Sequence, residues 1–329
     1  MHHVLLIGAG TMALEHVKAY RQMNDVTIVG VVAQGTEQVS KLSESLPLTY
    51  FPSYEAAVTT LAHIDVVDIC LPTHLHRQYV ELAANDGFHV ICEKPLARTV
   101  GEARNMIDFC KERGVRLFVG HVVRFFPEYV MAKHLVEQGR IGEIAVARAS
   151  RGGPFPTGRD NWYADYSKSG GVVLDLMIHD FDFLRWCFGE VERVYGKGML
   201  EQKMSRRDYA LVTLRFKSGV IAHVEGTWAH NTFSMGYELA GQTGVIEYDS
   251  SKEQPVILSQ QSDPLSGTGV AVPTSPLQEN PYERELRHFL HCLDTNTEPL
   301  VTTEDALQAI RIAMAALKSM ETGDVVQMK

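Results

Sequence analysis

Short apolar runs alternate with amphipathic stretches over the first 120 residues of the chain. The apolar runs predict buried β-strands, and the amphipathic stretches between them predict helices. The predicted strands cover residues 3–8, 26–33, 66–72, 89–94 and 116–123. The predicted helices cover residues 11–23, 38–46, 75–87 and 100–114. Near-continuous apolar strands that alternate with helices indicate a parallel sheet covered on both faces.

The second half of the chain has longer strands with more alternation between apolar and polar positions. The predicted strands cover residues 143–152, 191–200, 209–219, 220–229 and 235–244. The predicted helices lie near residues 127–139, 170–189, 281–294 and 303–321. Residues 250–281 are rich in Ser, Pro, Gln and Gly, which predicts loops with short edge strands. This pattern therefore predicts an α+β domain with a large, open, mostly antiparallel sheet.

The length supports two domains, because 329 residues with 45% hydrophobic content exceed what one ordinary core holds. We predict an α/β Rossmann domain over residues 1–121 and an α+β substrate-binding and oligomerisation domain over residues 122–329. The last helix, at about 303–321, is the element that could pack back on the first domain.

Charge and cysteine content narrow the class of protein. The net charge is −9 and no Lys/Arg run occurs, which disfavours nucleic acid and anionic membrane surfaces as partners. No apolar run approaches the roughly 20 residues of a spanning helix. The five cysteines are widely spaced without a C-x-x-C pair, which favours free thiols and a cytoplasmic protein.

A glycine-rich turn follows the first predicted strand. Gly8, Gly10 and Ala13 form G-x-G-x-x-A, with Thr11 and Met12 between them. The first glycine allows a tight turn, the second lets a pyrophosphate approach the backbone, and the third small residue lets helix and strand pack closely. Because the motif opens an alternating strand–helix series, it predicts a dinucleotide site rather than a turn without a ligand.

The end of the second strand does not decide between NAD and NADP. An acidic residue there would hold the ribose hydroxyls of NAD, but the chain has Gln34, Gly35 and Thr36. Gln34 could hydrogen-bond either cofactor. We favour NAD slightly, because no cation is at hand for a 2′-phosphate.

Two further strand ends carry candidate cofactor contacts. Pro72 and Thr73 follow the third strand, with His74 and His76 close behind. The alternative is a plain helix start, with Thr73 as the cap and both histidines exposed. Glu93 and Lys94 follow the fourth strand, and Pro95 keeps Lys94 out of helical geometry. An ammonium there could donate to an oxygen whose carbon gains or loses hydride.

A glycine pair, Gly170 and Gly171, precedes a helix that contains Asp175 and His179. Residues four apart in a helix lie one above the other on the same face. Histidine suits proton transfer near neutral pH, and a carboxylate one turn away can orient it. The alternative is a helix-stabilising pair. Asp180 and Asp182 lie at other angles, so we expect structural or interdomain contacts from them.

Taken together, these motifs resemble the Gfo/Idh/MocA family of NAD(P)-dependent dehydrogenases, named after glucose–fructose oxidoreductase and inositol dehydrogenase. The resemblance covers nearly the whole chain, through GAGTMA (8–13), PTHLH (72–76), HVICEKPLA (89–97), GHVVRFFPEY (120–129), NWYAD (161–165), GGVVLDLMIHDFD (170–182) and ELAGQTGVIEY (238–248). It implies a Rossmann domain, a large-sheet domain, and homodimers or homotetramers built by packing the sheets together. It also implies that Lys94, Asp175 and His179 form the catalytic group, in a cleft between the domains.

The family resemblance adds several binding residues. His121, at a position often occupied differently in the family, is a candidate contact for nicotinamide or substrate. Arg124 matches a recurrent family arginine, structural by default and otherwise a substrate ligand. Trp162 and Tyr163 belong to a loop whose polar groups suit polyhydroxylated ligands. The other polar residues assigned to this pocket are Arg151, Arg159, Asp160, Asn161, Asp165 and Tyr166.

The predicted reaction is hydride transfer between nicotinamide and a hydroxyl or carbonyl of a sugar, cyclitol or related polyol. In it His179 is the general base, Lys94 stabilises the developing oxyanion, and Asp175 positions substrate and His179. Three alternatives stay open: another redox substrate such as a dihydrodiol, imine or biliverdin-like ketone; a non-redox, glycosidase-like enzyme with tightly held NAD; and a dinucleotide-sensing regulatory protein. A sensor has no need of an acid–base group, which argues against the last.

Overall fold

The structure is a computed structural model that describes residues 1–33, 47–199, 208–252 and 280–328. The chain divides into two compact units. The first unit contains Met1–Val122 and Asn280–Leu307, and the second contains Val123–Glu279 and Gln308–Lys329. The first unit thus takes a segment from near the end of the chain.

The first unit is built on a six-stranded sheet with the order β3-β2-β1-β4-β5-β6. Its strands are β1 (His2–Ile7), β2 (Val26–Val32), β3 (Tyr50–Phe51), β4 (Val66–Ile69), β5 (His89–Glu93) and β6 (Leu117–Gly120). All neighbouring strands are parallel. The strand order reverses between β1 and β4, and ligands of such sheets bind at the carboxyl ends of the strands there.

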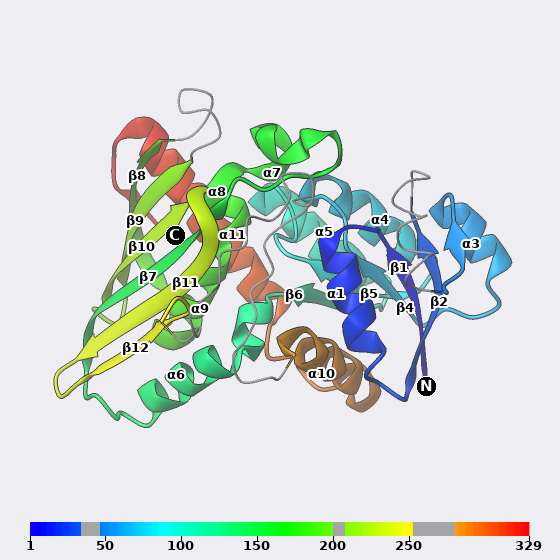
Figure 1. The fold of residues 1–329 in the computed structure, drawn as a ribbon, viewed down its shortest axis with the longest axis horizontal. Coiled ribbons are helices and arrows are strands. Elements are labelled where there is room, and N and C mark those ends of the chain that lie inside the picture. The colour runs from blue at the N-terminus through cyan, green and yellow to red at the C-terminus, as the bar shows by residue number, and fades with distance from the viewer. Residues whose placement is uncertain (34–46, 200–207, 253–279, 329) are drawn as a thin grey trace. The chain divides into compact units, whose positions relative to one another are not determined.

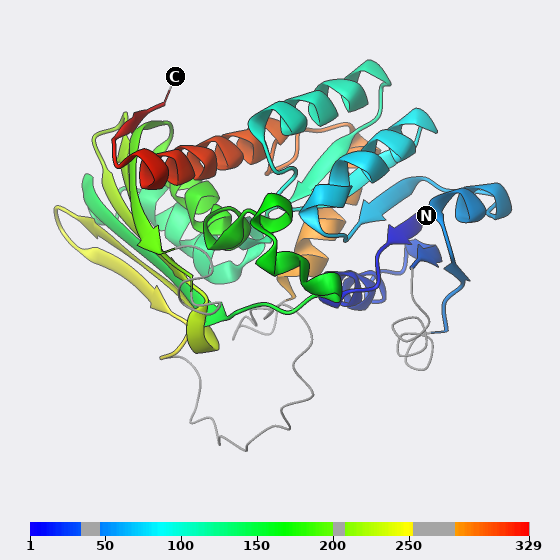
Figure 2. The ribbon, with the colours of Figure 1, turned by 90° about the horizontal axis from the view of Figure 1, so that it is seen from above.

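Helices cover both faces of this sheet. They are α1 (Thr11–Tyr20), α3 (Tyr54–Thr60), α4 (Thr73–Asn85), α5 (Val100–Glu112) and α10 (Pro281–Thr295). Helix α1 packs with α10 on one face, and α4 packs with α5 on the other (Figures 1 and 2). Ser53 and Thr99 start α3 and α5 by accepting a backbone N–H three residues ahead. The predicted parallel sheet with two covered faces is confirmed.

The second unit is built on a seven-stranded sheet with the order β12-β11-β7-β10-β9-β8-β13. Its strands are β7 (Ile144–Pro154), β8 (Val191–Met199), β9 (Tyr209–Phe216), β10 (Ile221–Thr227), β11 (Ala229–Gly241), β12 (Val245–Asp249) and β13 (Val326–Gln327). The sheet is mixed and mostly antiparallel, since only β7 and β10 pair in parallel. The predicted sheet class is confirmed, and the parallel pair is an addition to it.

The helical segments of the second unit are η1 (Val122–Phe125), α6 (Pro127–Glu137), η2 (Arg159–Ala164), α7 (Tyr166–Ser169), α8 (Gly171–Asp175), α9 (Ile178–Phe188) and α11 (Thr303–Thr322). The first residue of η1 and the first turn of α11 belong to the first unit. Helices α6, α8 and α9 gather on one face of the sheet (Figure 1). Burial alternates along β10 accordingly: Ala222 and Val224 are buried, whereas His223 and Glu225, the residues that follow each of them, are not. Period-two alternation of this kind leaves the second face of the sheet open.

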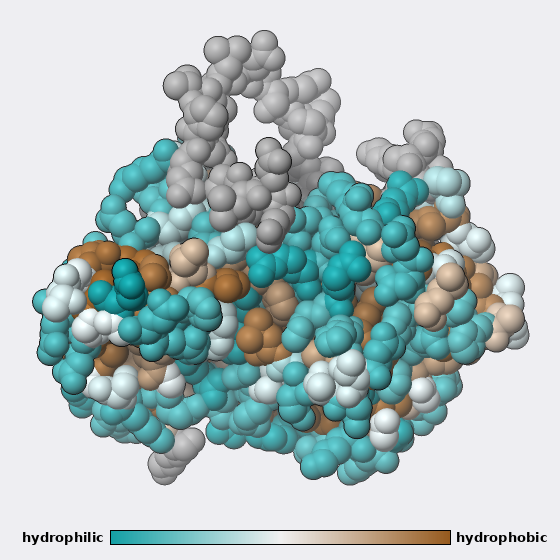
Figure 3. Space-filling view, turned by 90° about the horizontal axis from the view of Figure 1, so that it is seen from below, coloured by the Kyte–Doolittle hydropathy of each residue, from teal (hydrophilic) through white to brown (hydrophobic). Residues whose placement is uncertain are grey.

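Hydrophilic residues cover most of the molecular surface seen in Figure 3, and hydrophobic ones form separate groups between them. Among the described residues, no helix combines the length and apolar character needed to cross a membrane. All five cysteines are free, as the spacing predicted, and four of them are buried.

Some predicted helices and strands differ from the structure, and others lie outside the described residues. The single helix predicted over 170–189 is two helices, α8 and α9, separated at Leu176 and Met177. The strand predicted over 116–123 ends at Gly120, and a 3₁₀ turn replaces its last residues. The helix predicted over 38–46 and most of the loop predicted over 250–281 lie outside the described residues.

Candidate active site

The G-x-G turn has the geometry that its two glycines predict. Gly8 has a φ of 120°, and a Cβ atom there would lie 2.3 Å from the Cys70 carbonyl oxygen. Only glycine fits such a position without strain. A Cβ atom on Gly10 would meet no protein atom within 4 Å, so the space beside this residue is open to a ligand.

Helix α1 begins directly after this turn and presents an unshielded N-terminus. Gly10 is its N-cap and supplies no side-chain cap, and the first turn holds no acidic residue. Free backbone N–H groups and the positive end of the helix dipole favour a phosphate at such a place. Ala13 is 1% exposed and packs with Leu6, whereas Thr11 and Met12 stay partly exposed. The residues present therefore fit the pyrophosphate of a dinucleotide.

The loop after β4 corrects one expectation about the histidines. Pro72 is the N-cap of α4, so Thr73 is the first helical residue and not the cap. His74 is exposed as expected, but His76 is fully buried. Its ring nitrogens lie 2.9 Å from the Pro95 carbonyl oxygen and 2.8 Å from that of Leu71. Burial lowers the pKa of His76, against hydrogen bonds that oppose the change. His76 thus joins the loops after β4 and β5.

Lys94 stands at the end of β5 with a partly exposed side chain. Because β1, β4 and β5 are parallel neighbours, Gly8, Pro72 and Lys94 follow their strands at the same edge of the sheet. The peptide bond from Lys94 to Pro95 is cis. Three candidate cofactor contacts are thereby brought to one edge of the first unit. Gln34 lies outside the described residues, so the choice between NAD and NADP rests on sequence alone.

His121 follows β6 and is fully buried. Its backbone N–H donates to the Val119 carbonyl oxygen at 2.8 Å, which turns the chain sharply at the end of the strand. The residue lies at the carboxyl end of the outermost strand of this sheet, one strand beyond Lys94. A nicotinamide contact by His121 stays a prediction.

Asp175 and His179 do not share a continuous helix, contrary to the expectation from their spacing. Asp175 is the last residue of α8 and is 6% exposed. His179 is the second residue of α9 and is partly exposed. Gly170 and Gly171, which precede and start α8, have φ angles of 80° and 66°. A Cβ atom on Gly171 would lie 2.5 Å from Cε1 of Tyr166.

The break between these helices rests on the sheet. A Cβ atom on Gly226 of β10 would lie 2.3 Å from Cγ of Met177. A residue without a side chain at this point of the strand lets Met177 approach the backbone closely. The positions of Asp175 and His179 relative to the sheet therefore depend on Gly226, a residue of strand β10.

Two buried ion pairs fix α9. Arg151 donates from Nε and Nη2 to both carboxylate oxygens of Asp180, at 3.0 and 2.9 Å. Arg124 binds Asp182 in the same bidentate way, at 2.8 and 2.7 Å. The structural role expected of Asp180 and Asp182 is confirmed. Arg151 does not line a polar substrate pocket as expected, because it is 3% exposed and paired. The burial and pairing of Arg124 favour its structural role.

The loop that holds Trp162 and Tyr163 is a 3₁₀ segment, η2, which the sequence analysis described only as a loop. The two rings pack at a centroid distance of 3.9 Å and are nearly buried. Asp160 and Asn161 adopt φ angles of 54° and 51° and are exposed. The Tyr166 hydroxyl donates to Asp208. Arg159, Asp160 and Asn161 are thus the solvent-facing polar groups of this segment.

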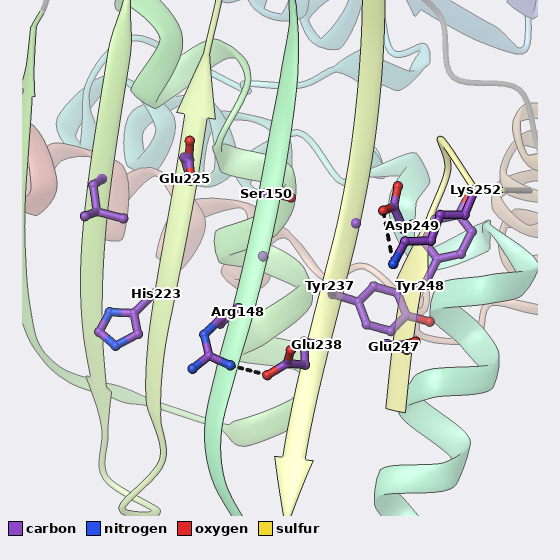
Figure 4. A pocket seen from close by; sticks show the side chains of 13 residues that line it. Arg148, Ser150, His223, Glu225, Tyr237, Glu238, Glu247, Tyr248, Asp249 and Lys252 are labelled. Atoms are coloured by element: carbon purple, nitrogen blue, oxygen red, sulfur yellow. Dashed lines mark hydrogen bonds and ion pairs between the residues drawn. The ribbon is translucent and has the colours of Figure 1, made fainter. Parts of the chain in front are cut away.

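The open sheet face carries a shallow hollow of about 410 Å³ in the second unit. Figure 4 shows Arg148 and Ser150 of β7, His223 of β10, and Tyr237 and Glu238 of β11 around it. Arg148 and Glu238 form an ion pair across neighbouring strands. The hollow contains none of the predicted catalytic residues, so it is a feature of the exposed sheet and separate from them.

The sequence analysis missed a buried polar cluster around His16 of α1. Its ring contacts Asp68 and Glu93, both of which are buried. One signal could have found it: Asp68 interrupts an otherwise apolar strand, and a buried carboxylate needs a partner.

The fold and the G-x-G edge define an oxidoreductase with an NAD-binding Rossmann domain and a second α/β domain. Comparison with protein families identifies the family itself. Residues 2–121 match the Gfo/Idh/MocA model described as "Oxidoreductase family, NAD-binding Rossmann fold". Residues 133–328 match its partner model, "Oxidoreductase family, C-terminal alpha/beta domain". The chain belongs to the Gfo/Idh/MocA oxidoreductase family.

Similar proteins match over almost their full length. An uncharacterized oxidoreductase, YrbE, of Bacillus subtilis (strain 168) is 29% identical over 97% of this chain and 94% of its own. A myo-inositol 2-dehydrogenase of Thermotoga maritima is 28% identical over 96% and 95%. The crystal structure of a probable dehydrogenase from Thermotoga maritima has a TM-score of 0.83 and 28% identity, and covers 99% of this chain and 98% of its own.

Proposed function

We propose that the protein transfers hydride between a nicotinamide cofactor and a hydroxyl-bearing or carbonyl carbon of a sugar, cyclitol or related polyol. The observation that carries this proposal is the shared sheet edge, where the open Gly10 turn and Lys94 follow neighbouring parallel strands. The similarity to a myo-inositol 2-dehydrogenase supports a polyhydroxylated substrate.

Bound nicotinamide supplies the hydride acceptor for oxidation and the donor for reduction. In the oxidative direction His179 takes the proton of the substrate hydroxyl as the C–H hydride leaves the same carbon. Lys94 donates to the oxygen as it becomes a carbonyl, and Asp175 orients substrate and His179. Proton transfer by a positioned side chain typically contributes ~10²–10⁴-fold to the rate. Trp162 and Tyr163 remain our candidates for substrate contacts.

We favour NAD over NADP as the cofactor. Residues 31–36 contain no lysine or arginine to pair with a 2′-phosphate, and no acid to exclude one. Direct titration with each reduced cofactor, followed by fluorescence, distinguishes the two.

We also propose that the open sheet face associates with a second copy to give a homodimer or homotetramer. Among the described residues no helix covers this face, which carries exposed Leu211 beside balanced charges such as Arg148 and Glu238. Ser150→Arg would place a large charged group on β7 at that face, and light scattering should then report a smaller particle. A cytoplasmic location suits the five free thiols.

The deciding experiment is a spectrophotometric panel of inositols, sugars, sugar acids and amino sugars with NAD⁺ or NADP⁺. We expect reduced nicotinamide to accumulate with one substrate class. Cofactor binding without net reduction would instead favour the two alternatives, a non-redox enzyme with tightly bound NAD or a dinucleotide-sensing protein. Cofactor that co-purifies in stoichiometric amount would indicate the first of these.

A further inference from the structure

A buried polar cluster lies inside the first unit, where three elements meet. His16 of α1 and Asp68 of β4 are 0% exposed, and Glu93 of β5 is 4% exposed. Strands β4 and β5 are neighbours, with Asp68 opposite Ile91. Burying three ionisable side chains costs free energy unless they bind one another, so their mutual geometry decides what the cluster does.

The imidazole of His16 bridges the two carboxylates. Its Nδ1 lies 2.8 Å from Oδ2 of Asp68, and its Nε2 lies 3.2 Å from Oε1 of Glu93. An ionised carboxylate only accepts hydrogen bonds, and a neutral imidazole carries a single N–H. Two ionised carboxylate partners would each take an N–H, so their positions on opposite ring nitrogens favour the imidazolium form of His16 over the neutral ring.

Glu93 also contacts the residue that follows β5, Lys94. Oε1 of Glu93 accepts from His16, and Oε2 of Glu93 accepts the backbone N–H of Lys94 at 3.0 Å. One side chain thus connects the buried imidazole of His16 to the backbone of the partly exposed Lys94. His76 holds the next residue from another side, through the Pro95 carbonyl oxygen.

We propose that His16 is a positioning residue for Lys94: its Nε2–H holds the Glu93 carboxylate, which in turn fixes the backbone of Lys94 at the sheet edge. The catalytic consequence rests on the function proposed above for Lys94. The chain of contacts itself does not depend on that function.

The charge states agree with this arrangement. Burial lowers the pKa of His16, but the charge of Asp68, the neighbouring Cys70 and the hydrogen bonds to both outweigh it, and the pKa lies well above its usual value. Burial raises the pKa of Glu93, but the hydrogen bond and charge of His16, with Lys94 and His76, bring it below its usual value.

Other titratable side chains from α1, β4 and α10 also lie near the imidazole of His16 or its partner Asp68. Tyr20 of α1 donates its hydroxyl to Oδ2 of Asp68 at 2.8 Å. Tyr282 of α10 has its ring 6.2 Å from that of His16, and Glu285 of the same helix is also buried. Burial and the charge of Asp68 raise the pKa of the Cys70 thiol.

The cluster does not suit a metal ion. His16, Asp68 and Cys70 have ligand atoms within 4.8 Å of one another. A metal needs a neutral imidazole nitrogen and a thiolate, however, and here the bridging geometry protonates both nitrogens while the thiol stays neutral.

Nitrogen-15 NMR of the histidine-labelled wild-type protein tests the charge state directly. We expect the two ring nitrogens of His16 to keep the shifts of an imidazolium from pH 6 to pH 8. His16→Gln assigns the signals, because they disappear in that variant. A His16 ring without a proton on Nε2 at pH 7 would overturn the proposal.

Two matched variants separate positioning from stability. His16→Gln cannot bridge both carboxylates as a cation. Asp68→Asn damages the same cluster, but it leaves a neutral His16 able to donate from Nε2 to Glu93. We expect His16→Gln to speed hydrogen exchange of the Lys94 amide and to lower kcat at least tenfold, with the Kd for NADH within about threefold of wild type. Asp68→Asn should keep kcat within about threefold at a similar loss of Tm. His63→Gln, at an exposed histidine of the same unit, should change none of these.

The outcomes also separate this proposal from the function on which it rests. If Lys94→Met leaves turnover unchanged, the catalytic role of Lys94 fails, while the NMR and amide-exchange measurements still decide the role of His16. Equal losses of kcat in His16→Gln and Asp68→Asn, or an unchanged Lys94 amide in His16→Gln, would show that His16 only stabilises the fold.

Discussion

Asp175 ends α8 and His179 is the second residue of α9, so a break at Leu176 and Met177 separates two residues that the sequence places one helical turn apart. The break is seated on the sheet, with Met177 against Gly226 of β10. The geometry of the pair is therefore set by tertiary packing, and a strand residue controls it.

His179→Ala should lower turnover by at least ~10²-fold, because it removes the proposed general base. Cofactor binding should stay nearly unchanged, because the G-x-G turn belongs to the first unit and His179 to the second. Steady-state kinetics and NADH fluorescence measure the two effects. His134→Ala, at an exposed histidine of α6 in the same unit, is the control and should be close to wild type. Near-normal turnover in His179→Ala would remove His179 from the mechanism.

Gly226→Ala should destabilise the second unit and lower kcat, because the new methyl group would overlap Cγ of Met177 at 2.3 Å. Overpacking of this kind typically costs about 1–3 kcal/mol. Met177→Ala in the same chain opens the space and should restore much of the lost Tm. If the single variant keeps wild-type Tm and kcat, the break does not depend on this contact.

Gly10→Ala should weaken NADH binding at least tenfold, about 1.4 kcal/mol, with little change in Tm. Its Cβ meets no protein atom, so the clash would be with the ligand alone. Gly101→Ala is the matched control, since that position in α5 is also open. It should leave NADH binding unchanged and add stability of up to about 1 kcal/mol. Tight NADH binding by Gly10→Ala would place the pyrophosphate elsewhere.

The stability of the first unit should depend on pH through His16 and Glu93. The pKa of His16 is raised on folding, so its contribution is full below about 6.5 and is lost as pH rises through the folded value. The pKa of Glu93 is lowered, so its contribution is full above about 4.5 and is lost as pH falls through the folded value. Between pH 6.5 and the folded pKa of His16, the wild type should lose about 1.4 kcal/mol per pH unit more than His16→Gln. Denaturant titrations at pH 6 to 9 measure the slopes, and parallel slopes would contradict the assignment.

The cysteines should react slowly with a thiol reagent in the native protein. Burial raises the pKa of Cys110 and of Cys187 to about 12, and Cys70 and Cys92 are shifted upward as well. Because the thiolate is the reactive form, these four cysteines should react fully only after denaturation. Rapid native labelling of Cys70 or Cys92 would show that the core of the first sheet opens.

The sequence determined the elements whose signals are local. Apolar strands, a glycine turn at Gly8 and Gly10, and the E-K-P segment at Lys94 each depend on neighbours in the chain, so their pattern predicted the Rossmann sheet and the edge at which we propose that the cofactor binds. The long alternating strands likewise predicted a sheet with one open face. The family resemblance then named the residues proposed for catalysis.

Tertiary structure alone decided the relations between residues far apart in the chain. The break between Asp175 and His179 lies against Gly226. Arg151, which the sequence assigned to a substrate pocket, is instead the buried partner of Asp180. His16, Asp68 and Glu93 are separated by 52 and 25 positions, and no local pattern couples a helix histidine to carboxylates in two strands. Burial brought them together, because a charge removed from water must find its counter-charge inside the fold.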